Sequence, residues 1–499
     1  MSTVETAKRP LRRFTGRSLA GLIVVLATGV GFGVLLALVR LKWQPMEGVD
    51  HGVARDLNLV VAHDRPLLAV LRTVTSLGSH TVLFPLVGVA AVSLLIRRRI
   101  RLAVYLAVTG LGALILDPAL KTVVGRVRPV VADPVAYGPG NSFPSGHALG
   151  SLVSYGALLL VFLPALPRRA RRPVTALVAL LVLAIGFSRI ALGVHYVSDV
   201  VGGWLLGVAW LGVTGYAFQM WRRETGRPTT EPLSEGLEPE AAPDLKVEHP
   251  EGGHSRPLHP IAATSVLVVG WVFVFGLVTG LGELIDRYGH GQGDLLGDST
   301  VPHWLAAHRT ATLNQVTFWF SEAGNTHLII GVGLAAAALA LAWIRRWRPV
   351  VFLFVLMAGE VTLFVSAVAI VSRPRPDVPH LENHLPTSSY PSGHVAATIC
   401  LYTGIALLVF PRTRAWWRWL TVVAAVLMPL LVAAARLYRG MHHPTDLLGS
   451  VLLAACWVPL VYRVVQPCAD EPAELRWAVR LGRWYRQRRA TGAVASANE

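Results

Sequence analysis

Long apolar runs alternate with short polar segments along the whole chain. In the first half, the runs cover about residues 18–39, 80–96, 102–120, 146–166, 174–193 and 199–219. In the second half, they cover about residues 259–282, 327–344, 349–371, 393–411, 420–435 and 445–465. Most of these runs approach the roughly 20 residues that a helix needs to cross a bilayer. The pattern predicts an all-α integral membrane protein with about twelve spans, six in each half.

Composition supports this reading and narrows the possible partners. The chain has 499 residues, of which 53% are hydrophobic and 15% charged, and this excludes a soluble globule. Its net charge of +17 comes largely from short arginine tracts at the ends of apolar runs, such as residues 97–101 and 167–172. That placement is typical of cytoplasmic loops and argues against a nucleic-acid partner. The three cysteines give no sign of a disulfide framework or a thiolate metal site.

The same patterns divide the chain into five parts. A basic cytoplasmic tail (1–17) precedes a first six-helix domain (18–220), and a cytoplasmic segment rich in Glu, Pro, Gly and Ser (221–258) predicts a flexible linker. A second six-helix domain (259–466) and a basic cytoplasmic tail (467–499) follow. The first apolar run favours an uncleaved helix over a signal peptide. For the last tail, an amphipathic helix on the inner leaflet and a solvated segment both remain open.

The segment between the first two spans has an amphipathic pattern. Apolar residues recur at helical spacing within residues 41–79, which suggests a helix that lies at the membrane interface. A plain loop is the alternative.

Residues 188–199 (SRIALGVHYVSD) place charged side chains at the edge of an apolar run. Such side chains are costly there unless they have partners or a function. Arg189 can hold an oxyanion through paired hydrogen bonds, and His195 can act as a nucleophile or as an acid and base. Asp199 follows four residues later and can fix the tautomer of the imidazole. Taken alone, the stretch is equally compatible with an interfacial ion pair.

Two further stretches point to phosphate chemistry. Residues 121–129 (KTVVGRVRP) contribute the cations Lys121 and Arg128, and residues 143–147 (FPSGH) stand just before an apolar run. Backbone N–H groups at the start of a helix favour an anion, and a glycine lets the backbone approach it closely. Catalysis of phosphoryl transfer consists mostly of positioning and charge stabilisation, which such donors supply.

The three patterns K-x6-RP, PSGH and SR-x5-H-x3-D, in this order, resemble the signature of the type 2 phosphatidic acid phosphatase superfamily. The resemblance implies a six-helix membrane bundle in which His195 attacks phosphorus to form a phosphohistidine. It further implies that Asp199 orients His195, and that His147 protonates the leaving group and then activates water. The implied phosphate-binding residues are Lys121, Arg128, Ser145, Gly146 and Arg189. The implied reaction uses no metal and no other cofactor.

The whole motif set returns in the second half at a constant spacing. The differences 375−128, 394−147, 442−195 and 446−199 all equal 247. This predicts a tandem duplication of the domain. Two positions depart, because Val368 stands where the lysine would be and Ala435 where the serine would be. The corresponding candidates are His394, His442 and Asp446 for catalysis, and Arg375, Ser392, Gly393 and Arg436 for phosphate binding.

The sequence is compatible with either an active or an inactive second site. We hypothesise that Arg439, which stands where the first half has Leu192, partly compensates for the missing lysine. The whole chain is expected to be a multi-pass cell-membrane phosphatase that hydrolyses a lipid phosphate or a polyprenyl diphosphate. Both termini would be cytoplasmic and both sites extracytoplasmic. A lipid-linked phosphotransferase and a lipid flippase or transporter are the alternatives, and neither the lipid nor the oligomeric state can be read from the sequence.

Overall fold

A computed structural model describes residues 5–138, 140–247, 260–289, 294–382 and 388–468. The chain divides into two compact units, Met1–Lys246 and Val247–Glu499. The described residues form helices and connecting segments without strands. Within these described ranges, eleven stretches of helix are long and apolar enough to cross a membrane, and Gly393–Val409 is a shorter apolar helix. The predicted all-α architecture, with six apolar helical stretches in each half, is confirmed.

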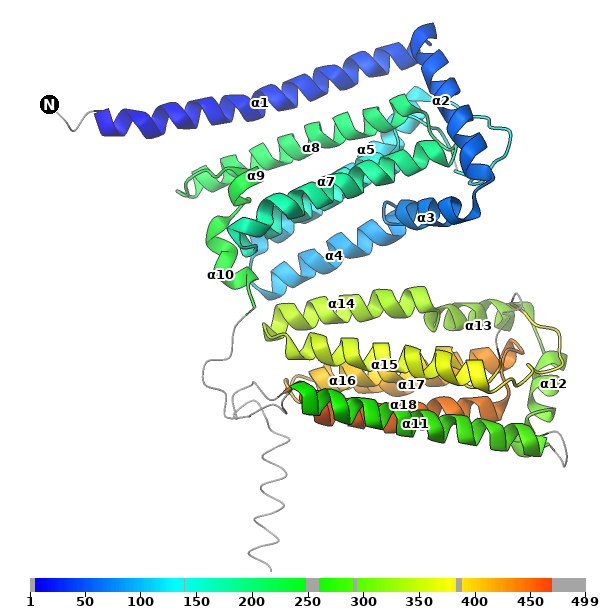
Figure 1. Ribbon diagram of the computed structural model, residues 1–499. Coiled ribbons are helices and arrows are strands. Elements are labelled where there is room, and N and C mark those ends of the chain that lie inside the picture. The colour runs from blue at the N-terminus through cyan, green and yellow to red at the C-terminus, as the bar shows by residue number, and fades with distance from the viewer. Residues whose placement is uncertain (1–4, 139, 248–259, 290–293, 383–387, 469–499) are drawn as a thin grey trace, which may run out of the picture. The chain divides into compact units, whose positions relative to one another are not determined.

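The first unit is an antiparallel bundle with small helices at both ends (Figure 1). Its helices are α1 (Glu5–Arg40), α2 (Gln44–Ala62), α3 (Arg65–Ser76), α4 (His80–Ile96), α5 (Ile100–Val124), α6 (Gly146–Phe162), η1 (Leu163–Ala165), α7 (Arg168–Ala191), α8 (Val197–Glu224), α9 (Pro232–Glu235), η2 (Pro239–Ala241) and α10 (Ala242–Leu245). Residues 5–17, which the sequence assigns to a polar tail, already belong to α1.

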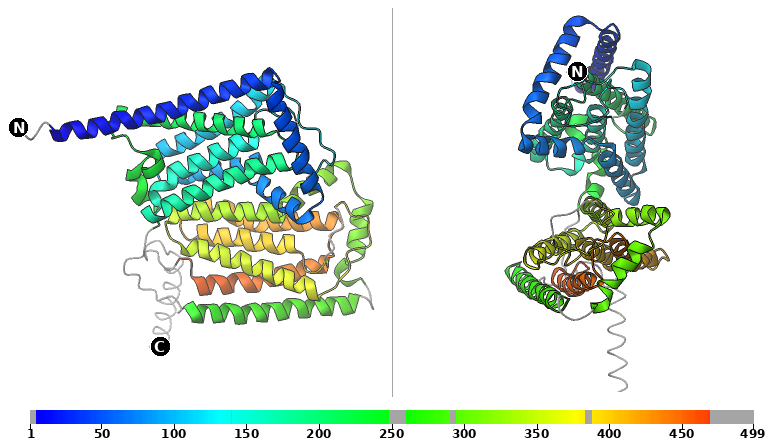
Figure 2. Two further views of the ribbon diagram at one scale, coloured as in Figure 1. Left: turned by 45° about the horizontal axis from the view of Figure 1, so that its top comes forward. Right: turned by 90° about the vertical axis from the view of Figure 1, so that its right-hand side faces the viewer.

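The second unit repeats the bundle (Figures 1 and 2). Its helices are α11 (Pro260–Gly289), η3 (Leu295–Gly297), α12 (Thr300–Ala307), α13 (Ala311–Ala323), α14 (Thr326–Ile344), α15 (Arg348–Ile370), α16 (Gly393–Val409), α17 (Arg418–Tyr438) and α18 (Pro444–Val465). The C-terminal tail lies outside the described residues from position 469 onward.

Several motif residues lie on helix ends, not in the connections between the helices. Helix α5 continues past its apolar run to Val124, so Lys121 stands in its last turn. Arg189 likewise stands in the last turn of α7, and Asp199 in the first turn of α8. Cations near a helix C-terminus and anions near an N-terminus interact favourably with the helix dipole, which explains why the helices extend this far.

The segment between the first two spans folds as two helices, α2 and α3, so the helical part of the prediction for residues 41–79 is confirmed, and its position at the membrane interface stays a prediction. Val61 of α2 and Leu71 of α3 are buried, and they form a small apolar cluster with Leu192 and Val194 from the α7–α8 connection. Because His195 directly follows Val194, this packing fixes the backbone that carries the candidate nucleophile.

The predicted flexible linker is wrong for residues 232–245. Leu237 and Ala241 are fully buried against the ends of the first bundle. Arg222, itself 1% exposed, donates to Glu240 at 2.8 Å. A buried leucine and a paired arginine order the segment despite its polar composition. Residues 248–258 of the linker lie outside the described part of the chain.

Candidate active sites

His195 lies in the short connection between α7 and α8 and is 1% exposed. Its Nδ1 is 3.3 Å from Oδ2 of Asp199, and that same oxygen accepts the backbone N–H of Tyr196 at 2.9 Å. A ring nitrogen that faces a carboxylate carries the proton, so Nε2 keeps the lone pair. Burial lowers the pKa of His195 to about 4. The ring is therefore neutral at neutral pH and is held in one orientation, as the candidate nucleophile requires.

Arg128 places its charge next to that lone pair. Its Nη1 donates to the carbonyl oxygen of Val194 at 2.7 Å and lies 3.1 Å from Nε2 of His195. Its Nε donates to the carbonyl oxygen of Gly140 at 3.0 Å. The guanidinium is thus anchored by backbone on two sides, where it can bind an oxygen of an anion that lies next to Nε2 of His195.

Lys121, Ser145 and Gly146 meet at the first turn of α6. Lys121 Nζ donates to Oδ2 of Asp117 at 2.9 Å, as expected for a structural ion pair. A Cβ on Gly146 would lie 2.7–2.9 Å from the Asp117 carboxyl group, so the pair sits directly on this turn. Ser145 is the N-cap residue and accepts the N–H of Ala148 at 3.5 Å. The lysine therefore stands beside the backbone N–H groups at the start of α6.

Arg189 and His147 complete the first-half group. Nη1 of Arg189 donates to the Thr75 hydroxyl at 2.9 Å, and its buried Nε has no hydrogen-bond partner among the described residues. His147 is within electrostatic range of Arg189, Lys121 and His195. All of the residues that the sequence predicts for the first site thus gather at one end of the bundle, the end that carries α2 and α3.

Sequence reasoning missed Arg126, which organises the base of this site. Its Nη1 donates to Oδ1 of Asp199 at 2.9 Å. Its Nη2 donates to Glu47 at 2.7 Å and to Asp50 at 2.9 Å. The arginine therefore ties the aspartate behind His195 to helix α2. A signal was present, because Arg126 also recurs at the constant spacing, as Arg373 (373−126 = 247).

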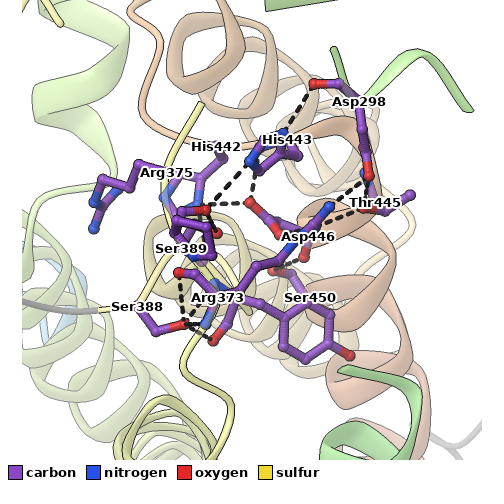
Figure 3. Close-up of polar contacts among 12 residues, drawn as sticks. Asp298, Arg373, Arg375, Ser388, Ser389, His442, His443, Thr445, Asp446 and Ser450 are labelled. Atoms are coloured by element: carbon purple, nitrogen blue, oxygen red, sulfur yellow. Dashed lines mark hydrogen bonds and ion pairs between the residues drawn. The ribbon is translucent and has the colours of Figure 1, made fainter. Parts of the chain in front are cut away.

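The second half builds the same network from its own residues (Figure 3). Arg373 donates to Asp446 and to Asp298, the latter at 2.6 Å. His442 differs slightly from its counterpart, because its Nδ1 contacts the carbonyl oxygen of Ser389 at 2.7 Å and lies 3.6 Å from Asp446 Oδ2. The carbonyl selects the same tautomer, so Nε2 again carries the lone pair. Burial lowers the pKa of His442 to about 4.

The positions that hold the Asp117–Lys121 ion pair in the first half are apolar in the second half. Phe364 and Val368 take the places of Asp117 and Lys121 (364−117 = 247 and 368−121 = 247), so the ion pair is replaced as a unit. A Cβ on Gly393 would lie 2.7 Å from the Phe364 ring. This ring therefore covers the first turn of α16.

Arg439 does not substitute for the lysine in the way hypothesised from the sequence. It donates to Glu382 at 2.6 Å, to the Leu381 carbonyl at 2.8 Å and to the Asn314 carbonyl at 3.2 Å. All three guanidinium nitrogens are therefore already engaged. The remaining second-half candidates, His394, Arg375 and Arg436, lie within electrostatic range of one another and of His442.

Comparison with known proteins bears on both halves. Residues 99–223 and 349–470 each match the PAP2 superfamily. Phosphatidylglycerophosphatase B of Bacillus subtilis is 29% identical over 141 residues, which cover 28% of this chain and 69% of that protein. Undecaprenyl-diphosphatase of Sulfolobus acidocaldarius is 29% identical over 134 residues (25% of this chain, 59% of that one). Sphingosine-1-phosphate phosphatase 2 of Mus musculus is 31% identical over 159 residues (31% and 40%).

Among solved structures, the chain is similar to the first transmembrane PAP2 type phosphatidylglycerolphosphate phosphatase from Bacillus subtilis. The identity is 25% and the TM-score 0.37, over 40% of this chain and 98% of that one. The chain spans less than two thirds of two of the three relatives named above. One matched region lies within each bundle, over α5–α8 and over α15–α18, and each contains a complete set of candidate histidines, aspartate and arginines. The chain therefore carries the PAP2 superfamily domain twice, in tandem.

Proposed function

We propose that this chain is a membrane phosphatase that hydrolyses a lipid phosphate or a polyprenyl diphosphate through a phosphohistidine on His195. The observation that carries the proposal is the environment of the His195 ring. Asp199 holds Nδ1, and Arg128 stands 3.1 Å from the lone pair on Nε2. The named relatives are all phosphatases, and their names specify phospholipid, polyprenyl and sphingoid substrates.

The reaction proceeds in two displacements. In the first, Nε2 of His195 forms a bond to phosphorus while the bond from phosphorus to the leaving oxygen breaks, and His147 gives that oxygen a proton. In the second, His147 takes a proton from water, the hydroxide attacks phosphorus, and the N–P bond breaks to release phosphate and restore His195. Arg128, Lys121 and Arg189 bind the phosphoryl oxygens, whose charge changes along the reaction.

The membrane setting supports a lipid substrate. A mainly apolar cavity of about 200 Å³ lies between α4, α5 and α6, and Gly146 is part of its lining. A hydrocarbon chain can occupy this cavity while the phosphate lies on the first turn of α6. We place the site on the non-cytoplasmic face, because the arginine tracts lie at the opposite ends of the same helices. Six spans in each half bring both sites to the same face and both termini to the cytoplasm.

The proposal predicts how activity and stability respond to acid. The folded-state pKa of His195, about 4, lies below the ordinary 6.5. The unfolded chain therefore binds more protons between these values, and stability falls as the pH drops from about 6.5 to about 4. The protonated ring has no lone pair, so kcat/KM should fall in the same direction. Denaturant unfolding across this range should give a shallower pH dependence for His195→Gln than for the intact protein, and an equal slope would contradict the assignment.

The direct test is phosphate release from a panel of lipid phosphates and polyprenyl diphosphates with EDTA present. The intact protein should release phosphate at an undiminished rate, and a variant with His195→Ala and His442→Ala should not. Loss of activity in EDTA would overturn the metal-independent mechanism. Phosphate found on an added acceptor would identify a phosphotransferase instead. Lipid movement that persists in the double variant, with no phosphate release by the intact protein, would favour a flippase.

A further inference from the structure

The candidate phosphate-binding residues of the second half are here called its cradle, namely Arg375, Ser392, Gly393 and Arg436. Beside them lies an acidic side chain that the first half lacks. Glu382 lies in the connection between α15 and α16, and its Oε2 accepts a hydrogen bond from Nη1 of Arg436 at 2.5 Å. Its Oε1 accepts two hydrogen bonds, one from Nε of Arg439 at 2.6 Å and one from the Ser321 hydroxyl at 2.7 Å. Arg436 is fully buried. One carboxylate therefore bridges two arginines at the candidate phosphate site.

The corresponding arginine of the first half has a neutral partner. Arg189 stands at the position of Arg436 and donates its Nη1 to the Thr75 hydroxyl at 2.9 Å. The positions that match Glu382 and Arg439 hold Val135 and Leu192 (382−247 = 135 and 439−247 = 192). The bridging acid and its second arginine are thus both specific to the second half.

Resting on the function proposed above, we propose that Glu382 is a built-in competitor for the phosphate-binding arginine of the second half. Glu382 holds Nη1 of Arg436 and offsets the charge of its guanidinium, so a phosphoryl oxygen meets a neutralised arginine on which only Nε and Nη2 lack a partner among the described residues. The Glu382 carboxylate also lies within electrostatic range of His394 and Arg375, so it repels a second anion from the middle of the cradle. As a result, the second half binds its phosphate substrate far more weakly than the first half does.

Glu382 is ionised under ordinary conditions. Burial of its carboxyl group acts to raise the pKa, but Arg436, Ser321 and Arg439 outweigh burial and lower the pKa to about 2. The competing charge is therefore present throughout the range in which a phosphatase works.

The rest of this cradle remains able to take an anion. Nε and Nη2 of Arg436 are buried and have no hydrogen-bond partner among the described residues. The Ser392 hydroxyl, at the start of α16, is likewise buried and has no hydrogen-bond partner among the described residues. Buried donors without partners are costly, and a bound phosphate group would satisfy them. Removal of the competing charge should accordingly reveal activity rather than leave an inert site.

The test uses the full chain with His195→Ala, so that only the second half can turn over. Added to this background, Glu382→Gln keeps the size and the acceptor oxygen of the side chain but removes its charge. We expect kcat/KM for a short-chain lipid phosphate to rise about ten- to a hundredfold, mainly through a lower KM. The matched control is Asp377→Asn, which makes the same change in charge at an exposed position of the same connection and should leave kcat/KM unchanged. Further addition of His442→Ala should erase the gain.

The outcomes separate this inference from the proposed function. If the intact protein releases phosphate but Glu382→Gln gives no gain over the Asp377→Asn control, the competitor role is wrong and the function stands. If the intact protein releases no phosphate from any lipid, the function itself fails. Thermal unfolding verifies that the variant is folded. If it is not, Glu382→Asp, whose shorter side chain draws the carboxylate back from Arg436, should show a smaller gain, and no gain would overturn the role.

Discussion

Replacement of His195 by alanine should lower the phosphatase activity of the first half by about 10⁴-fold or more. The change removes the atom that bonds to phosphorus, and no neighbouring group can take over covalent catalysis. The fold should be retained, because Arg126 still pairs with Asp199 at 2.9 Å in the absence of the ring. Phosphate release should be measured in a His442→Ala background, so that the second half cannot contribute.

A suitable control for this loss is His63→Ala. His63 is an exposed residue after α2, and its Nδ1 lies 2.9 Å from the Leu59 carbonyl oxygen. Its loss should leave kcat unchanged. Rapid quenching of the His442→Ala protein in alkaline detergent, in which the P–N bond of a phosphohistidine is stable, should also trap a labelled phosphoprotein that disappears with His195→Ala. A label that persists would place the nucleophile elsewhere.

The second large effect concerns Arg126. Its side chain is 9% exposed and bridges Glu47, Asp50 and Asp199. Replacement by methionine leaves these carboxylates close together without a cation, which for a buried pair costs about 3–5 kcal/mol. Denaturant unfolding in detergent should show a loss of this size. Activity should fall as well, since Asp199 is no longer held in line with His195.

Arg55→Met provides the matched comparison, because Arg55 pairs with Asp56 at 3.0 Å on the surface, with 69% of its side chain exposed. That change should alter the unfolding free energy by less than about 1 kcal/mol. The loss of unfolding free energy in Arg126→Lys should lie between those of Arg126→Met and Arg55→Met, because an ammonium group keeps the charge but cannot contact three carboxylates at once as the forked guanidinium does. An Arg126→Met protein as stable as the Arg55→Met protein would show that the bridge is not structural.

Much of the fold can be predicted from the sequence because the membrane imposes a simple rule. Each predicted apolar run corresponds to an apolar helix, and the run at about residues 80–96 matches α4 (His80–Ile96). Backbone groups in hydrocarbon must be satisfied within the helix, so hydropathy alone locates the spans. The candidate site residues could be chosen because their spacing within each motif is short and is repeated 247 residues later.

The contacts that tie the site together could not be predicted in the same way. Arg126 pairs with Asp50 across 76 positions of sequence, and no local period connects them. The constant spacing of the repeat also gives no signal for Asp50, because Asp50 and Asp298 are 248 positions apart and the motif residues are 247 apart. Glu382 has no counterpart in the first half at all. Such pairs are set by how the helix ends converge, which is a property of the packed bundle and not of any one segment.

Each bundle closes its network on its own residues, so the Asp50–Arg126–Asp199 chain and the Asp298–Arg373–Asp446 chain share no member. A mutation of a residue in one of these networks therefore removes no member of the other. Gene duplication with this architecture supplies redundancy at the level of the single polypeptide. The two copies already differ in this way, because the second has Val368 at the position of Lys121 and Glu382 at the position of Val135.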